Sequence, residues 1–169
     1  MKRSWNMTSR WIGSSLVVVV LTLCGLAAPA AADDQIPFTA EGTAVITSVT
    51  HLPGGLTQLN GTVSGTATHL GNTTGPITRT QNHQGSFSTT TVLIGSNGTD
   101  SVILAISGQF DSPKGNGCVV TSTGTYTVTG GTGSFANATG SGTITTEIDQ
   151  CAGTATGIYE GTISRPNSG

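Results

Sequence analysis

Residues 127–142 constrain the fold of this chain more than any other segment. The stretch begins as a Thr/Val strand, passes through a glycine cluster around Phe135, and leaves as a second Gly/Thr strand. Glycine tolerates positive φ and close backbone approach, so glycines around one aromatic ring predict a sharp, packed corner between two β-strands. The segment predicts architecture, and it contains no residue pattern that indicates a chemistry.

The beginning of the sequence is typical of a secretory signal peptide. Three basic residues precede an apolar, uncharged run at 16–26, and residues 28–32 offer an A-x-A cleavage site. The apolar run is shorter than the ~20 residues that span a bilayer. Cys24 raises the alternative of a lipoprotein anchor, but a large leucine precedes it and fits lipid attachment poorly. We expect residues 1–32 to be removed and residues 33–169 to be extracellular.

The charge of residues 33–169 narrows the classes of partner. This part of the chain has three Lys or Arg and eight Asp or Glu, a net charge of −5. So few cations cannot form a surface that follows nucleic-acid phosphates, and they also disfavour attraction to anionic lipid. No second long apolar run follows the first. We therefore expect neither nucleic-acid binding nor stable membrane insertion.

Threonine and glycine dominate the same part of the chain, with 29 and 23 residues respectively. Threonine favours strands, while abundant glycine and scarce Leu, Lys and Glu oppose long helices. Disorder is the alternative for such a composition. It is disfavoured because apolar residues recur with strand periodicity and the charge density is low. The sequence predicts one all-β domain over residues 33–169.

Seven or eight strands are expected, joined mostly by short turns. The clearest case places Val102, Leu104, Ile106 and Phe110 on one face, with Gly108 as the break in the pattern. Long consecutive strands with hairpin connections favour an up-and-down β-barrel over a Greek-key sandwich. The predicted strands are 38–50, 56–70, 85–94, 99–110, 119–129, 141–149 and 154–164.

Two parts of the pattern allow alternatives. Residues 72–84 fit either a loop or a short edge strand at 77–80, because Asn, Gly and Pro interrupt the apolar positions. Thr-x-Thr triplets recur along the chain and suggest an ice-binding solenoid, but their spacing is irregular whereas a solenoid has a constant repeat. The triplets fit the solvent-facing sides of ordinary strands better.

Cys118 and Cys151 are an even number of cysteines in an exported chain, which predicts a disulfide. A hairpin of residues 119–129 and 141–149 has the glycine corner at its tip and brings both cysteines to its open end. In an antiparallel hairpin the numbers of directly opposite residues have a constant sum. If the apolar residues of both strands are to face the same side, that sum must be even, whereas 118 and 151 have an odd sum. Either a bulge intervenes or Cys151 lies in the turn beyond the strand.

Residues 126–140 resemble the glycine-rich motif of the allene oxide cyclase and dirigent superfamily. Members carry a similar G-G-[ST]-G-x-F core, here residues 130–135, followed by a further glycine, here Gly140. The resemblance covers about residues 118–164, and this part of the chain looks like exported bacterial relatives with the same barrel. It implies an eight-stranded antiparallel barrel with a central cavity, often oligomeric in the plant families, so a homo-oligomer is among the expected states. The motif is structural in the family, so the resemblance assigns no catalytic role.

No metal or cofactor site is predicted. The three histidines, His51, His69 and His83, are too far apart in sequence for the usual zinc spacings, and the cysteines are expected to be bonded to each other. Surface positions are therefore expected for the histidines. Only His69 shares a barrel-facing side with Val63 and Ala67.

No catalytic residue is predicted either. Glu147, Asp149 and Glu160 alternate with apolar residues and should face solvent, whereas the face of Glu41 is undecided. No carboxylate pair converges, no G-x-S-x-G elbow is present, and the glycine corner lacks the lysine and helix of a phosphate loop.

The pocket candidates are His69, Tyr126 and Tyr159, together with Glu41, whose face the pattern leaves open. An eight-stranded barrel has just enough room for one small ligand. We expect a secreted, non-catalytic barrel that binds a small apolar ligand or acts at the cell envelope. The alternative is a cyclase-like or dirigent-like isomerase that steers an apolar intermediate. An interior filled by aromatic side chains would contradict both, and a cavity with Glu41 or His69 inside would favour the enzyme.

Overall fold

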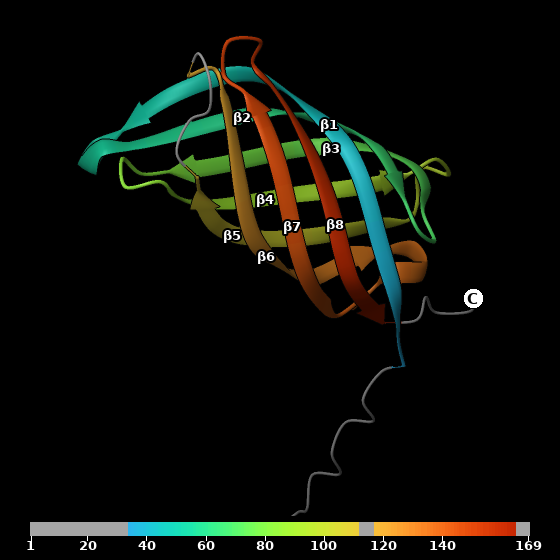
Figure 1. Ribbon diagram of the computed structural model, residues 1–169. Coiled ribbons are helices and arrows are strands. Elements are labelled where there is room, and N and C mark those ends of the chain that lie inside the picture. Colours follow the sequence, from blue (N-terminus) through green and yellow to red (C-terminus); the bar gives the residue numbers. More distant parts are fainter. Residues whose placement is uncertain (1–33, 112–116, 165–169) are drawn as a thin grey trace, which may run out of the picture. The chain divides into compact units, whose positions relative to one another are not determined.

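The fold is a single closed antiparallel β-barrel. The structure, a computed structural model, describes residues 34–111 and 117–164, so the expected signal peptide lies outside the described residues. Each strand pairs with the next and β8 pairs with β1, as in an up-and-down barrel (Figure 1). The strands are β1 (Gln35–Leu52), β2 (Leu56–Ala67), β3 (Gly71–Gln81), β4 (Ser86–Gly95), β5 (Ser101–Phe110), β6 (Val119–Thr132), β7 (Gly140–Asp149) and β8 (Thr154–Ser164).

The ambiguous stretch at 72–84 is a full strand, β3, and brings the count to eight. Pro76 lies within it, and the recorded pairing of β3 with β4 skips from Thr74 to Ile77 around it. Proline has no N–H to donate to a ladder, so a gap at this position is expected. The Thr91 hydroxyl donates a 3.1 Å hydrogen bond to the Pro76 carbonyl and satisfies that acceptor instead.

The apolar faces predicted from period-2 alternation are the interior of the barrel. Val102, Leu104 and Ile106 of β5 are buried, as are Tyr126 of β6 and Ile144 of β7. The core formed by these faces follows the inner wall around all eight strands. The prediction of an all-β, eight-stranded up-and-down barrel is therefore confirmed.

Glycine occupies inward-facing positions on all eight strands, where it alternates with buried residues. A Cβ atom at Gly108 would lie 2.7 Å from Phe87, and one at Gly161 would lie 2.5 Å from the hydroxyl oxygen of Tyr126. Aromatic rings therefore lie across some of these glycines, whereas at others, such as Gly61 and Gly75, the nearest atom is a backbone carbonyl oxygen of the neighbouring strand. Gly108, a break in the sequence pattern, is a packing position. The inward glycines are Gly42, Gly61, Gly65, Gly75, Gly95, Gly108, Gly124, Gly142, Gly157 and Gly161.

The glycine corner seals one end of the barrel, which we call the closed end. Between β6 and β7 the chain forms a 3₁₀ turn, η2 (Gly133–Phe135), and buries Phe135 to 2% exposure. The Asp100 carboxylate of the neighbouring β4–β5 turn accepts a 2.8 Å hydrogen bond from the Ser134 N–H. Gly133 has φ +59°, and a Cβ there would collide with Asp100. The glycine is therefore needed for both conformation and space.

The disulfide between Cys118 and Cys151 is present at the opposite end, with the two Cα atoms 5.4 Å apart. The β6–β7 pairing runs without a shift from Val119–Asp149 to Val128–Gly140. Cys151 lies in the turn after β7 and is not part of the strand pairing. Of the two explanations for the odd sum of the cysteine numbers, the turn is therefore correct and the bulge is not.

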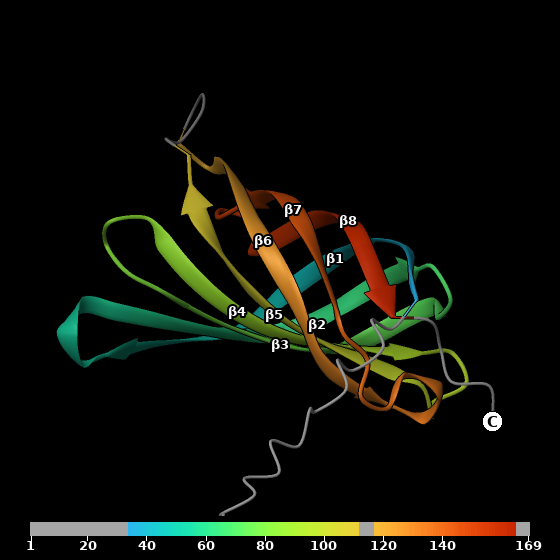
Figure 2. The ribbon, with the colours of Figure 1, turned by 90° about the horizontal axis from the view of Figure 1, so that it is seen from below.

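The hairpin of β1 and β2 projects beyond the other strands at this second end, which we call the open end (Figure 2). A register shift between Ile46 and Ser48 changes which residues of β1 face inward. As a result Val49 pairs with Leu59, and both line the mouth of the barrel. Val49 is 56% exposed because the hairpin extends past its neighbours.

Candidate functional site

Aromatic side chains fill the half of the interior that adjoins the closed end. The rings of Phe38 and Tyr126 pack edge to face with centroids 6.0 Å apart, and Tyr126 packs against Tyr159 at 5.9 Å. Such edge-to-face pairs are the preferred geometry for aromatic packing. A second aromatic pair, Phe87 and Phe110, packs at 5.0 Å nearer the open end, where it leaves the mouth unfilled.

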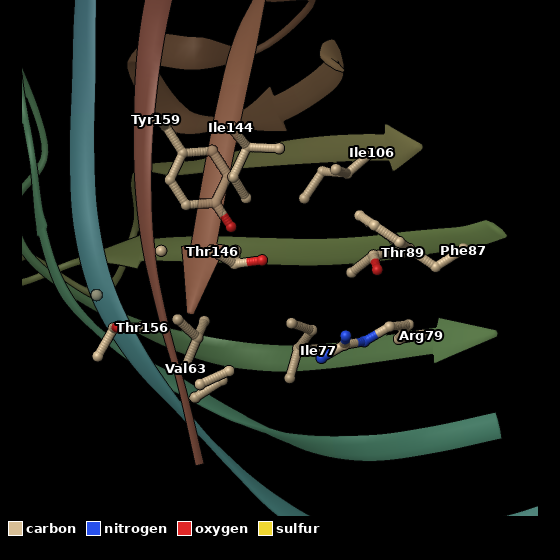
Figure 3. Close-up of a pocket in the computed structure, with 14 residues that line it drawn as sticks. Val63, Ile77, Arg79, Phe87, Thr89, Ile106, Ile144, Thr146, Thr156 and Tyr159 are labelled. Atoms are coloured by element: carbon tan, nitrogen blue, oxygen red, sulfur yellow. The ribbon is translucent and has the colours of Figure 1, made fainter. Parts of the chain in front are cut away.

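Beyond Tyr159 the side chains become smaller and leave an inner cavity of about 40 Å³. Since one water molecule needs roughly 10–15 Å³ of such space, the inner cavity has room for about three waters and for no larger molecule. Figure 3 shows the Tyr159 hydroxyl, Thr146 and the Arg79 side chain directed into this space from different strands. Its walls are otherwise mostly apolar, with Ala44, Val63, Ile77, Phe87, Ile106, Ile144 and Ala155 among them.

A larger cavity of about 480 Å³ lies in the mouth at the open end. This volume falls within the roughly 300–1,000 Å³ that is typical of small-molecule sites. Polar groups, including Asn82, His83 and Asp149, contribute to its lining, and Arg79 borders both cavities. The apolar lining residues of the mouth are Ile46, Val49, Leu59, Phe110, Val120 and Ile148.

Arg79 is the most unusual residue of this interior, because its side chain is only 7% exposed. The guanidinium carbon lies 5.7 Å from the ring centroid of Phe87 and 5.5 Å from that of Phe110, within cation–π range. Burial lowers the pKa of Arg79, and the proximity of Tyr159 raises it. Within residues 34–111 and 117–164, Arg79 has no hydrogen bond or ion pair with another side chain.

The two tyrosines of the interior are both neutral at ordinary pH. Burial raises the pKa of Tyr159 to about 12, and the Arg79 charge opposes that rise. Burial likewise raises the pKa of Tyr126 to about 12. The Tyr126 hydroxyl is buried without a hydrogen-bond partner in the described part of the chain, whereas Tyr159 borders the inner cavity.

The four predicted pocket candidates do not share one interior cavity, although Glu41 and Tyr159 both border a groove between β1, β2 and β8. Tyr159 lines the inner cavity, and Tyr126 packs against Tyr159 on the side of the closed end. Glu41 points outward and is exposed on β1. His69 lies in the turn after β2 with φ +68°, exposed, with its Nε2 atom 3.2 Å from the Pro37 carbonyl oxygen. Neither Glu41 nor His69 borders the inner cavity or the mouth.

Other titratable groups stay apart from one another. His51 and His83 are exposed, as are Glu147 and Glu160, and Asp149 accepts backbone hydrogen bonds from the turn that follows it. Among the described residues, no three His, Cys, Asp or Glu side chains are placed to share a metal ion. Nor does the described part of the chain contain a helix long and apolar enough to cross a membrane.

Sequence reasoning did not identify Arg79 as a site residue. Arg79 lies in the stretch 72–84, for which the sequence allows either a loop or a strand, and it enters the sequence analysis only through the net charge. The signal was its spacing from Ile77: two residues apart on one strand, both must face the same side. Once β3 is a strand with Ile77 inward, Arg79 must also face inward.

The chain has no significant match among protein-family models, curated proteins or solved structures.

Proposed function

We propose that this protein is an exported, non-catalytic barrel that binds one small, largely apolar molecule at its open end. The observation that carries the proposal is the uneven filling of the interior. Three aromatic rings, those of Phe38, Tyr126 and Tyr159, fill the half next to the closed end, whereas the mouth keeps a cavity of about 480 Å³ with six apolar side chains, Phe110 among them, in its lining. An empty apolar cavity of ligand size is a default binding-site hypothesis.

Export is supported by the signal-like residues 1–32 and by the disulfide, since disulfides persist in oxidising compartments. The ligand would therefore be met outside the cytoplasm or at the cell envelope. The low number of cations also argues against nucleic acid or an anionic membrane as the partner. Assembly into a homo-oligomer, as the family resemblance implies, is compatible with a site reached through the open end.

A relationship to the allene oxide cyclase and dirigent superfamily is part of this proposal. It rests on the motif at 126–140 and is supported by the eight-stranded closed barrel. The alternative function, an isomerase, would use the same cavity. The two residues that would favour it, Glu41 and His69, lie outside that cavity, so binding is the function the geometry supports better.

Binding can be tested with N-phenylnaphthylamine, a neutral apolar probe whose fluorescence rises in apolar surroundings. Purified protein should give a saturable fluorescence increase. Leu59→Trp should abolish it because the larger side chain fills the mouth. Ile158→Trp is the matched control, since Ile158 is 58% exposed on the outer wall. Absence of saturable binding, or equal binding by both variants, would contradict the proposal.

A further inference from the structure

We propose that the ligand is a monocarboxylic acid with an apolar body, and that it enters with its carboxylate first to pair with Arg79. This inference rests on the proposed binding function and adds the chemical class and orientation of the ligand. It starts from the placement of charge. Residues 33–169 contain only three cations, and one of them lies inside the barrel; the other two, Lys114 and Arg165, are outside the described residues.

The Arg79 charge is incompletely compensated by the protein. A buried cation is costly unless it is paired and hydrogen-bonded. The rings of Phe87 and Phe110 make cation–π contacts with the guanidinium group. These contacts provide no conventional hydrogen-bond acceptor for its N–H groups. No carboxylate of the described residues contributes to the altered pKa of Arg79. The two acidic residues that line the mouth accept hydrogen bonds from other partners: Asp111 from the Thr121 hydroxyl and Asp149 from its own turn.

The number and shape of the donors select the anion. One guanidinium supplies a single positive charge, so a monoanion is neutralised whereas a dianionic phosphate would leave an unpaired charge in a poorly hydrated site. The planar fork of arginine matches the two oxygens of a carboxylate. Tyr159 and Thr89 line the same inner cavity with hydroxyl groups that offer further hydrogen-bond donors, whereas the Thr146 hydroxyl is already hydrogen-bonded to Ser122.

The two cavity sizes set the orientation. The inner cavity, about 40 Å³, admits a carboxylate-sized group but no apolar body. The mouth, about 480 Å³, admits the body and contacts it with apolar side chains such as Leu59 and Val49. Because Arg79 borders both spaces, the head group reaches it from the mouth while the remainder stays between the mouth walls.

Calorimetric titration with a matched pair of ligands tests the inference on the full protein. Naphthoate and naphthylmethanol share an apolar body and differ in the charge of the head. Charge-assisted hydrogen bonds contribute about 1.5–3 kcal/mol, so naphthoate should bind at least about tenfold more tightly. Arg79→Met should remove this preference and keep binding of the alcohol, which also shows that the variant folds. Gln81→Met, two residues along on the same face of the mouth, should keep the preference.

NMR spectroscopy of the unsubstituted protein tests the same contact without relying on the Arg79→Met variant. The NεH resonance of Arg79 should shift on addition of naphthoate and stay in place with naphthylmethanol. Equal affinity for the two ligands, or a preference that survives Arg79→Met, would overturn the inference and leave the binding function intact. If neither these ligands nor the neutral probe binds, the proposed function fails together with this inference. Tighter binding of naphthalene sulfonate than of naphthoate would overturn the choice of carboxylate.

Discussion

At the closed end of the barrel Phe135 is 2% exposed and hydrogen bonds tie its turn to the neighbouring one, whereas at the open end Phe110 is only partly buried beside a charged side chain. Both ends are made of glycine-rich hairpins with an aromatic residue. The difference is what the aromatic ring contacts: other apolar side chains at one end, and Arg79 with open space at the other. We therefore expect substitutions at the closed end to affect mainly stability, and substitutions at the open end to affect mainly ligand binding.

The largest effect is expected from Phe135→Ala at the closed end. Loss of a fully buried ring costs roughly 3–5 kcal/mol of unfolding free energy, because it leaves a cavity that the tight corner cannot close. Phe110→Ala should cost roughly half as much or less, since that ring is already partly exposed to the mouth. Urea unfolding of both variants measures the difference. Equal losses would show that the two ends contribute alike.

The disulfide should contribute about 3–4 kcal/mol from the open end. It closes a loop with a sequence separation of 33, and in the chain-entropy model this restricts the unfolded chain by that amount. The double variant Cys118→Ala/Cys151→Ala should lower the unfolding midpoint while the neutral probe still binds. Thiol counting by mass spectrometry is the control, and two free thiols in the exported protein would contradict the bridge.

High pH should destabilise the aromatic half of the interior. Both tyrosines have a pKa of about 12 in the folded protein, above the ordinary value of 10.0. The stabilisation from the raised pKa values is complete below pH 10 and is lost as the pH rises through about 12, by roughly 2–3 kcal/mol for each tyrosine. Tyrosinate absorbance of Tyr126→Phe and Tyr159→Phe separates the two titrations. Ionisation near pH 10 in the folded barrel would contradict the burial of these groups.

Two glycines on one strand offer a smaller and sharper comparison. A methyl group at Gly161 would collide with the backbone carbonyl oxygen of Ser141 and crowd the Tyr126 hydroxyl at 2.5 Å, so Gly161→Ala should cost about 1–3 kcal/mol. At Gly157 the nearest atom is the Thr146 methyl carbon at 3.2 Å, next to the inner cavity. Gly157→Ala should therefore change stability by less than about 1 kcal/mol. Thermal unfolding of the pair checks the order, and the reverse order would contradict the division of the interior.

The smallest expected effect has the opposite sign. Replacing a buried charge by a well-packed apolar side chain is often neutral or stabilising, so Arg79→Met should raise the unfolding free energy of the ligand-free protein by about 1 kcal/mol. Arg79→Lys is the control that keeps the charge. A clear loss of stability in Arg79→Met would instead indicate that the cation–π contacts with Phe87 and Phe110 hold the open end together.

The fold was largely predictable because alternation and turn residues are local signals. The strand at 99–110 and the hairpin with Cys118 and Cys151 followed from period 2 and from symmetry about the glycine corner. β3 was harder, because Gly75 and Pro76 carry loop preferences and only pairing with β2 and β4 overrides them. The site escaped prediction for a related reason: whether Arg79 faces inward depends on the long-range pairing of an ambiguous strand.

Apart from Gly108, which interrupts a clear alternation, the inward glycines leave no signal in the sequence pattern, because a residue without a side chain adds no apolar position to it. Their role depends on which group of a neighbouring strand lies over them, a ring as with Phe87 over Gly108 or a backbone carbonyl as at Gly65. Which group lies over a given glycine is set by the register between neighbouring strands, and no single strand's sequence determines that register.

The glycines that line all eight strands also mean that the hollow of this barrel is defined by missing atoms. At Gly157 a methyl group would meet only side chains, so the inner cavity can shrink there without a change in the hydrogen-bonded wall. At most other inward positions, such as Gly61, Gly65 and Gly75, a methyl group would collide with a backbone carbonyl oxygen of the neighbouring strand. The size of the hollow and the spacing of the strands are therefore coupled, and a related sequence that replaces these glycines must also move its backbone.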